Sequence, residues 1–113
     1  MIMDEKKKIE IESMLNASKS KGIETSLIRK DGILIHSTVT LDETLPNIVS
    51  SIANITDELM KQSKDNQKEI EVTIDNVYFV IIPVKEYLLC SPVTDRELKK
   101  ELRALAEQVK GII

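Results

Sequence analysis

The sequence of 113 residues is poor in the residue types that carry most catalytic and metal-binding chemistry. Its single cysteine, Cys90, excludes an intrachain disulfide and a multi-cysteine metal site. This cysteine usage leads us to expect a reducing, intracellular location. The three glycines, at positions 22, 32 and 111, do not form the glycine-rich patterns that bind nucleotide phosphates. We therefore expect no nucleotide cofactor.

The single histidine, His36, does not supply the missing chemistry. A catalytic Cys/His pair would have to combine His36 with Cys90, and both fall in predicted strands. We interpret Cys90 as a small buried hydrophobe and His36 as a strand histidine, since free cysteine is often part of a core. One histidine also falls short of the three or four ligands that zinc requires. We predict no catalytic residue, no metal ligand and no cofactor, and hence a protein that is not an enzyme.

Aromatic residues and net charge argue against a nucleic-acid partner. The three aromatics, Tyr78, Phe79 and Tyr87, lie in predicted strands, where we expect them in the core, and they are too few for base stacking. The net charge of −3 and the pI near 5.2 have the wrong sign for a dedicated nucleic-acid binder. The only basic cluster, Lys6-Lys7-Lys8, is offset by neighbouring acids and predicts a solvated helix face.

Long apolar runs are also missing. No segment approaches the roughly 20 apolar residues of a membrane-spanning helix. The N-terminus lacks the apolar region of a signal peptide. The length suits one domain with one core. We expect a single cytoplasmic domain over residues 1–113.

The stretch Ile70–Val93 predicts three strands of an antiparallel meander. Residues 70–75 alternate apolar and polar side chains, which is typical of a half-buried strand. Residues 77–84 and 87–90 carry no charge, which favours strands covered on both faces in the middle of a sheet. Asp75-Asn76 suits a two-residue turn between the first two strands. The polar strand, Ile70–Ile74, is the expected edge of the sheet.

The remaining segments predict helices on both sides of this meander. Residues from Met1 to about Ser20, from Asp42 to about Lys64, and from Thr94 onward have helical periodicity, the last behind a Thr94–Glu97 capping box. Residues Ile23–His36 predict a hairpin with a turn at Asp31-Gly32. The order is α-β-β-α-β-β-β-α. We predict a three-layer α/β (α+β) sandwich in which a five-stranded antiparallel sheet carries the long second helix on one face and the terminal helices on the other.

The long helix has more apolar surface than one sheet contact needs. Its stripe runs from Leu45 to Ser63 and widens on the side of Ile48 and Ile55, with Ser51, Asn54 and Gln62 at its border. We infer that this helix meets its own sheet and a second surface. The alternative is that Ile55 packs under a loop of the same chain. The edge strand likewise offers unpaired backbone groups to a second chain.

The chain resembles the roadblock/dynein light chain family of small α/β domains. The matching features cover nearly the whole chain: Gly22-Ile23-Glu24, the hairpin Arg29–Ser37, the long helix, the edge strand Ile70–Ile74, the run Phe79–Val84 followed by Tyr87-Leu88-Leu89, and the closing helix with Leu98, Leu102 and Leu105. No single motif among them is specific. The resemblance lies in their order and spacing.

This resemblance implies a homodimer that works as a binding platform. In the family, two copies pair their third strands and long helices into one continuous sheet, and members bind, regulate or connect Ras-like small GTPases, some as GTPase-activating proteins that donate no catalytic residue. Carried onto this sequence, the implied dimer interface consists of Ile48, Ser51, Ile52, Ile55, Leu59, Gln62, Ile70, Glu71, Val72, Thr73 and Ile74. No motif indicates which residues would contact a GTPase.

Two functional hypotheses follow. The first is a homodimeric, non-catalytic scaffold or regulator of a Ras-like small GTPase. The second is a sensory or small-ligand-binding module, since related sandwich folds often hold ligands between sheet and helix. Dense β-branched residues and few inward polar groups favour the first hypothesis.

Overall fold

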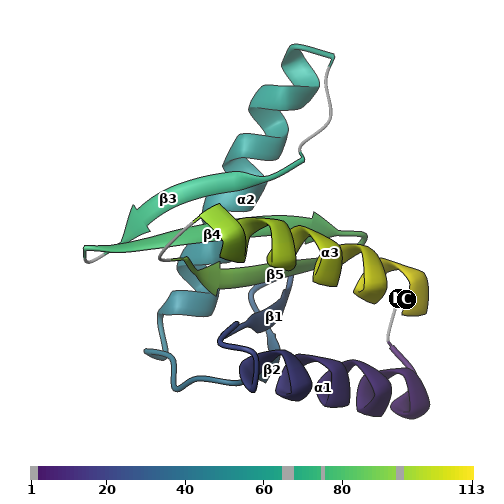
Figure 1. Ribbon diagram of the computed structural model, residues 1–113. Coiled ribbons are helices and arrows are strands. Elements are labelled where there is room, and N and C mark those ends of the chain that lie inside the picture. Colours follow the sequence, from purple (N-terminus) through teal and green to yellow (C-terminus); the bar gives the residue numbers. More distant parts are fainter. Residues whose placement is uncertain (1–2, 65–67, 75, 94–95) are drawn as a thin grey trace.

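The part of the chain that the structure describes forms three helices and five strands in the predicted order (Figure 1). The computed structural model describes residues 3–64, 68–74, 76–93 and 96–113. The elements are α1 (Glu5–Lys19), β1 (Ser26–Arg29), β2 (Leu34–Ser37), α2 (Leu45–Gln62), β3 (Ile70–Ile74), β4 (Val77–Val84), β5 (Tyr87–Pro92) and α3 (Arg96–Ile112). The fold class predicted from the sequence is confirmed.

The five strands form one antiparallel sheet in the order β2-β1-β5-β4-β3. The two uncharged strands, β4 and β5, lie inside the sheet, as their composition predicted. β3 lies at one edge and pairs with β4 alone, from Ile70 opposite Ile81 to Ile74 opposite Val77. The β1–β2 hairpin forms the other side of the sheet, where Leu27 of β1 pairs with Leu89 of β5. The predicted edge position of β3 is therefore confirmed.

Each face of the sheet has its own apolar core. On one face, α1 and α3 contribute Leu15 and Leu102, which pack among side chains such as Leu27 and Leu89. On the other face, α2 packs against a second group of buried strand residues: Ile28, Ile70, Phe79, Ile81, Leu88 and Cys90. Alternate residues of each strand point to opposite faces, so one uncharged strand can feed both cores. The three layers are visible in Figure 1, with α2 alone on its side of the sheet.

Helix boundaries differ from the sequence prediction for local reasons. α1 begins at Glu5 rather than Met1, because the Asp4 carboxylate accepts a hydrogen bond from the Lys7 amide at 2.8 Å and caps the first turn. α2 begins at Leu45 rather than Asp42. The Asp42 carboxylate instead accepts hydrogen bonds from the Thr44 amide at 2.9 Å and the Thr44 hydroxyl at 2.6 Å.

Several predicted signals fall outside the described residues. They are the first two residues of the predicted N-terminal helix, the break at residues 65–67, Asp75 of the β3–β4 turn, and Thr94 of the capping box. The described part of that turn, Asn76, has φ of 65°, in the left-handed region that asparagine tolerates. In the β1–β2 turn, Gly32 has φ of 97°, which only glycine adopts readily.

Candidate self-association surface

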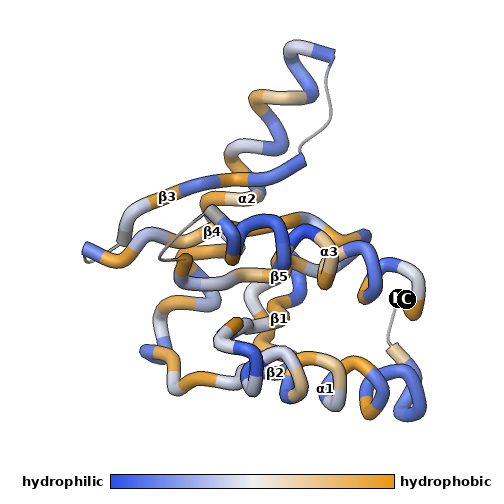
Figure 2. The backbone as a smooth tube through the Cα atoms, viewed as in Figure 1, coloured by the Kyte–Doolittle hydropathy of each residue, from blue (hydrophilic) through white to orange (hydrophobic). Residues whose placement is uncertain are grey.

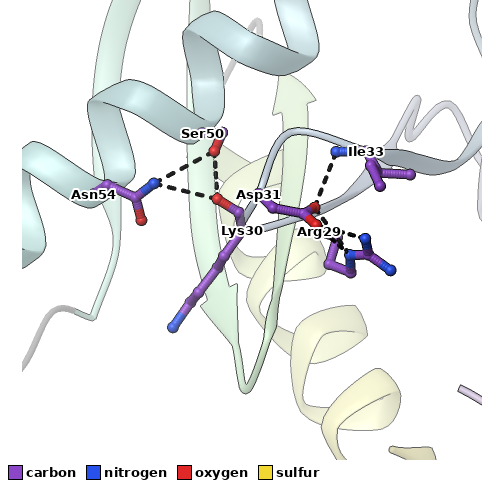
Figure 3. Close-up of polar contacts among 6 residues, drawn as sticks. All are labelled: Arg29, Lys30, Asp31, Ile33, Ser50 and Asn54. Atoms are coloured by element: carbon purple, nitrogen blue, oxygen red, sulfur yellow. Dashed lines mark hydrogen bonds and ion pairs between the residues drawn. The ribbon is translucent and has the colours of Figure 1, made fainter. Parts of the chain in front are cut away.

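The inner face of α2 is fastened to the β1–β2 turn (Figure 3). The buried Ser50 hydroxyl donates to the Lys30 carbonyl, and the Asn54 side-chain amide donates to the same oxygen at 3.2 Å. Val49 and Ala53 are fully buried on this side of the helix. These contacts fix the rotation of α2 about its own axis. They thereby decide which residues face outward.

The turn that receives α2 is itself held in one conformation. The Arg29 guanidinium donates to both carboxylate oxygens of Asp31 at 2.9 Å, and the Ile33 amide donates to the same carboxylate at 3.3 Å. The hydrogen bond from Arg29 lowers the pKa of Asp31, so this carboxylate stays ionised to a lower pH than an unpaired aspartate does. Because Lys30 lies between these two residues, the carbonyl that anchors α2 has a defined position.

The outer face of α2 carries three exposed apolar side chains, which we call the outer row. Ile48, Ile55 and Leu59 are 39%, 65% and 60% exposed. The three lie within an arc of about 40° on a helical wheel, on the side away from Val49 and Ala53. Since Ile55 is largely exposed, the alternative in which a loop of the same chain covers it is wrong. Ser51 and Gln62 are exposed beside the row, as the sequence predicted, whereas Ile52 is half-buried against the α2-side core.

The end of α2 reaches past the sheet. In Figure 1, the last turns of α2 project beyond β3, the edge strand. Figure 2 shows apolar and polar residues alternating along this projecting part. Ile52 of α2 and Ile70 and Val72 of β3 belong to the same apolar cluster, so helix and edge strand are neighbours. The projecting last turns of α2, which include Leu59, therefore lie on the same side of the molecule as the open edge of β3.

The residues of β3 divide between the two faces of the sheet. Ile70, 9% exposed, and Val72, half-buried, pack in the core under α2. Glu71 and Thr73 are exposed on the opposite face. Ile74 is the last residue of the strand. On its outer side β3 pairs with no strand of the described chain, so its outward backbone groups remain available to a second chain.

Side chains from α3 and β4 hold the polar face of β3. The Lys99 ammonium forms an ion pair with Glu71, and the Arg103 guanidinium donates to Glu69 at 2.9 Å. The hydrogen bond from Lys99, followed by that from the Tyr78 hydroxyl, lowers the pKa of Glu71. The edge strand is thus tied to the body of the protein on one face by charge and on the other by apolar packing.

The prediction that the three aromatic residues lie in the core is correct for two of them. Phe79 and Tyr87 are buried, as predicted, but Tyr78 is 37% exposed, so the prediction of a core position for Tyr78 is wrong. Tyr78 lies opposite Thr73 in the ladder and points its hydroxyl at Glu71. The role of Lys99, Arg103 and Tyr78 as supports of β3 was not found from the sequence.

The residues singled out for chemistry have structural surroundings. Cys90 is buried in the α2-side core. His36 Nε2 lies 2.9 Å from the Asn16 side-chain oxygen, between β2 and α1. Among the described residues, no group of three or more His, Cys, Asp or Glu side chains could hold a metal ion. No helix within the described ranges is long and apolar enough to cross a membrane.

One cavity lies on the same face of the sheet as α2. It has a volume of about 250 Å³ and sits beneath the segment that precedes the helix. Its floor includes Ile28, Phe79 and Cys90, and Glu24 and Asp42 are the two acidic residues in its wall. The cavity is separate from the outer row, since none of Ile48, Ile55 and Leu59 lines it.

Comparison with known proteins gives fold relatives only. No family model matches the sequence, and no curated protein matches it. Solved structures do match. They include MglB in a tetrameric arrangement, with a TM-score of 0.79, 16% identity, and coverage of 99% of this chain and 93% of that chain. MglB from Myxococcus xanthus matches with a TM-score of 0.79, 14% identity and the same coverage. The roadblock/LC7 domain from Streptomyces avermitilis has a TM-score of 0.72, 11% identity, and coverage of 88% and 94%. By its fold, the chain is of the roadblock type.

Proposed function

We propose that this protein is a homodimeric, non-catalytic scaffold or regulator of a Ras-like small GTPase. The observation that carries the proposal is that the described chain has both an exposed outer row on α2 and an edge of β3 that no other strand covers. A second copy related by a two-fold axis would cover both features at once, because such an interface uses the same patch on each copy. The MglB fold relative with a tetrameric arrangement is consistent with self-association. We expect the protein to act in the cytoplasm.

The outer row would supply a large share of the free energy that such a dimer needs. Full burial of an Ile or Leu side chain stabilises an association by roughly 1.5–3 kcal/mol. Because the three are only partly exposed, the surface left to bury equals about 1.6 such side chains on each copy, or about 5–10 kcal/mol for the pair, against an association cost of about 4–15 kcal/mol. Strand pairing at β3 would add backbone hydrogen bonds and fix the orientation. The interface would include all the residues predicted for it from the sequence.

The dimer is tested with Ile55→Asp. This change places a charge in the centre of the outer row, and we expect a monomer in sedimentation velocity or an aggregating protein. Asn47→Asp is the matched control, because Asn47 is an exposed residue of the same helix about 100° away from the outer row. The control should sediment as the unaltered protein does. An Ile55→Asp variant that remains a dimer would contradict the proposed interface.

The GTPase partner rests on the roadblock resemblance together with the lack of a catalytic residue set in the sequence. The test is capture of partners from native lysate by the immobilised dimer, followed by GTP hydrolysis measurements with each GTPase recovered. Faster hydrolysis would identify an activating regulator, and binding at an unchanged rate would identify a scaffold. Some proteins will bind the immobilised dimer but not the Ile55→Asp variant. If no GTPase is found among them, this function is contradicted.

The second candidate is a small-ligand-binding module. The 250 Å³ cavity beneath the segment before α2 favours it, since a cavity between sheet and helix layer is what such a module requires. A screen of small apolar metabolites by thermal unfolding tests this candidate. A saturable rise in melting temperature, lost when Cys90→Phe fills the cavity floor, would support it.

A further inference from the structure

Two copies of β3 that pair antiparallel would place residues of matching kind opposite each other. The five residues of β3 are Ile-Glu-Val-Thr-Ile, with isoleucine at both ends and valine at the centre. We infer that the proposed homodimer pairs two β3 strands with the two-fold axis at Val72. Val72 then lies opposite the partner's Val72, Glu71 opposite the partner's Thr73, and Ile70 opposite the partner's Ile74. This inference rests on the proposed homodimer and specifies how its two sheets join.

The two faces of β3 limit the possible registers. A slip of one residue would bring the α2-side residues of one copy onto the α3 side of the other. In β3, Ile70 and Val72 pack in the α2-side core, whereas Glu71 contacts Lys99 of α3. Only registers that keep these faces aligned extend both cores across the dimer. The axis must therefore pass through a residue position, with Glu71, Val72 and Thr73 as the central candidates.

Pair count and charge select Val72 among these three. An axis at Val72 pairs all five residues of the strand. An axis at Glu71 pairs only three of them and sets two glutamates directly opposite each other, and like charges in that position destabilise a sheet. An axis at Thr73 also pairs only three residues and leaves Ile70 and Glu71 outside the ladder. The register centred on Val72 keeps the most pairs and avoids the direct repulsion.

The polar face of β3 agrees with this register. Glu71 is already oriented by the ion pair with Lys99 and the hydrogen bond from Tyr78. A carboxylate can accept several hydrogen bonds, and a threonine hydroxyl can donate one. With the axis at Val72, the hydroxyl of the partner's Thr73 comes opposite Glu71, and this contact occurs twice in the dimer. On the opposite face, the two Val72 side chains face each other at the axis.

Cysteine crosslinking tests the register directly. Side chains opposite each other in an antiparallel pair have Cβ atoms about 4.5–5.5 Å apart, within reach of a disulfide after small adjustments. We expect mild oxidation to convert most Val72→Cys protein to a covalent dimer on a non-reducing gel. Glu71→Cys and Thr73→Cys should each stay mostly uncrosslinked alone. Mixed in equal amounts and allowed to exchange subunits, they should form a covalent heterodimer. The unaltered protein is the control, because its buried Cys90 should not crosslink.

The outcomes separate this inference from the proposed function. Crosslinking of Glu71→Cys alone, or of Thr73→Cys alone, would move the axis to that residue and overturn the register. Sedimentation under reducing conditions shows whether each variant is still a dimer. A dimeric Val72→Cys variant that fails to crosslink overturns the register and leaves the homodimer standing. An unaltered protein that sediments as a monomer overturns the homodimer and the register together.

Discussion

At the scale of single residues, Cys90 illustrates how burial decides chemistry. It is 3% exposed and packs among Ile28, Phe79 and Leu88 beneath α2. Burial raises the pKa of its thiol from 9.0 to about 12. A neutral thiol is a poor nucleophile, so Cys90 behaves in the folded protein as a small apolar side chain.

This buried thiol predicts a loss of stability in alkaline solution. The folded state disfavours the thiolate, so the contribution of Cys90 to stability is intact below pH 9 and declines as the pH rises toward 12. The steepest decline is about 1.4 kcal/mol per pH unit. Urea unfolding at neutral pH and near pH 10 should show a larger drop for the unaltered protein than for Cys90→Ala. Equal drops would mean that Cys90 does not contribute to the pH dependence.

At the scale of elements, one leucine of α2 and one leucine of α3 lie in opposite surroundings. Leu102 of α3 is fully buried in the core shared with α1, whereas Leu59 of α2 is mostly exposed in the outer row. Truncation of a buried leucine removes transfer free energy and leaves a cavity. Truncation of an exposed one removes little from the fold itself.

This contrast gives a matched pair of variants, each made in the Ile55→Asp background under conditions where sedimentation finds that variant monomeric. Leu102→Ala should lower the free energy of unfolding by roughly 2–5 kcal/mol. Leu59→Ala should change it by no more than about 0.5 kcal/mol. In the protein with Ile55 intact, Leu59→Ala should instead weaken self-association, measured by sedimentation at several concentrations. A large loss of monomer stability from Leu59→Ala would show that the outer row packs within its own chain.

The elements also show what could be predicted from the sequence. The periodicity of α2 indicated a stripe too wide for one sheet, because helix faces follow directly from residue spacing. The face of Tyr78 could not be predicted, because residues 77–84 have no charged residue to distinguish the two sides of the strand. The Lys99–Glu71 contact joins residues 28 positions apart on different elements. Such a contact depends on how α3 crosses the sheet, and no local pattern encodes that.

At the scale of the whole molecule, the proposed dimer links folding to concentration. Partner binding stabilises the folded state by mass action, since the unfolded chain lacks the interface. The melting temperature should therefore rise over about a hundredfold increase in protein concentration. Ile55→Asp should abolish this dependence, and Asn47→Asp should retain it. Differential scanning calorimetry measures all three proteins, and a flat profile for the unaltered protein would contradict self-association.

The position of Pro83 limits how far the sheet can grow. β3 pairs with β4 only as far as Ile81, so within the described residues no strand pairs with the outer side of β4 at Pro83, two residues farther along. Proline has no amide hydrogen and cannot donate to an added strand. If the β3 strand of a second copy were displaced beyond Ile70, it would lie beside Pro83. There it would find no amide hydrogen to continue the hydrogen-bonded ladder. Two copies of the protein can therefore pair along β3, while Pro83 prevents a longer open sheet edge on which further chains could assemble into fibres.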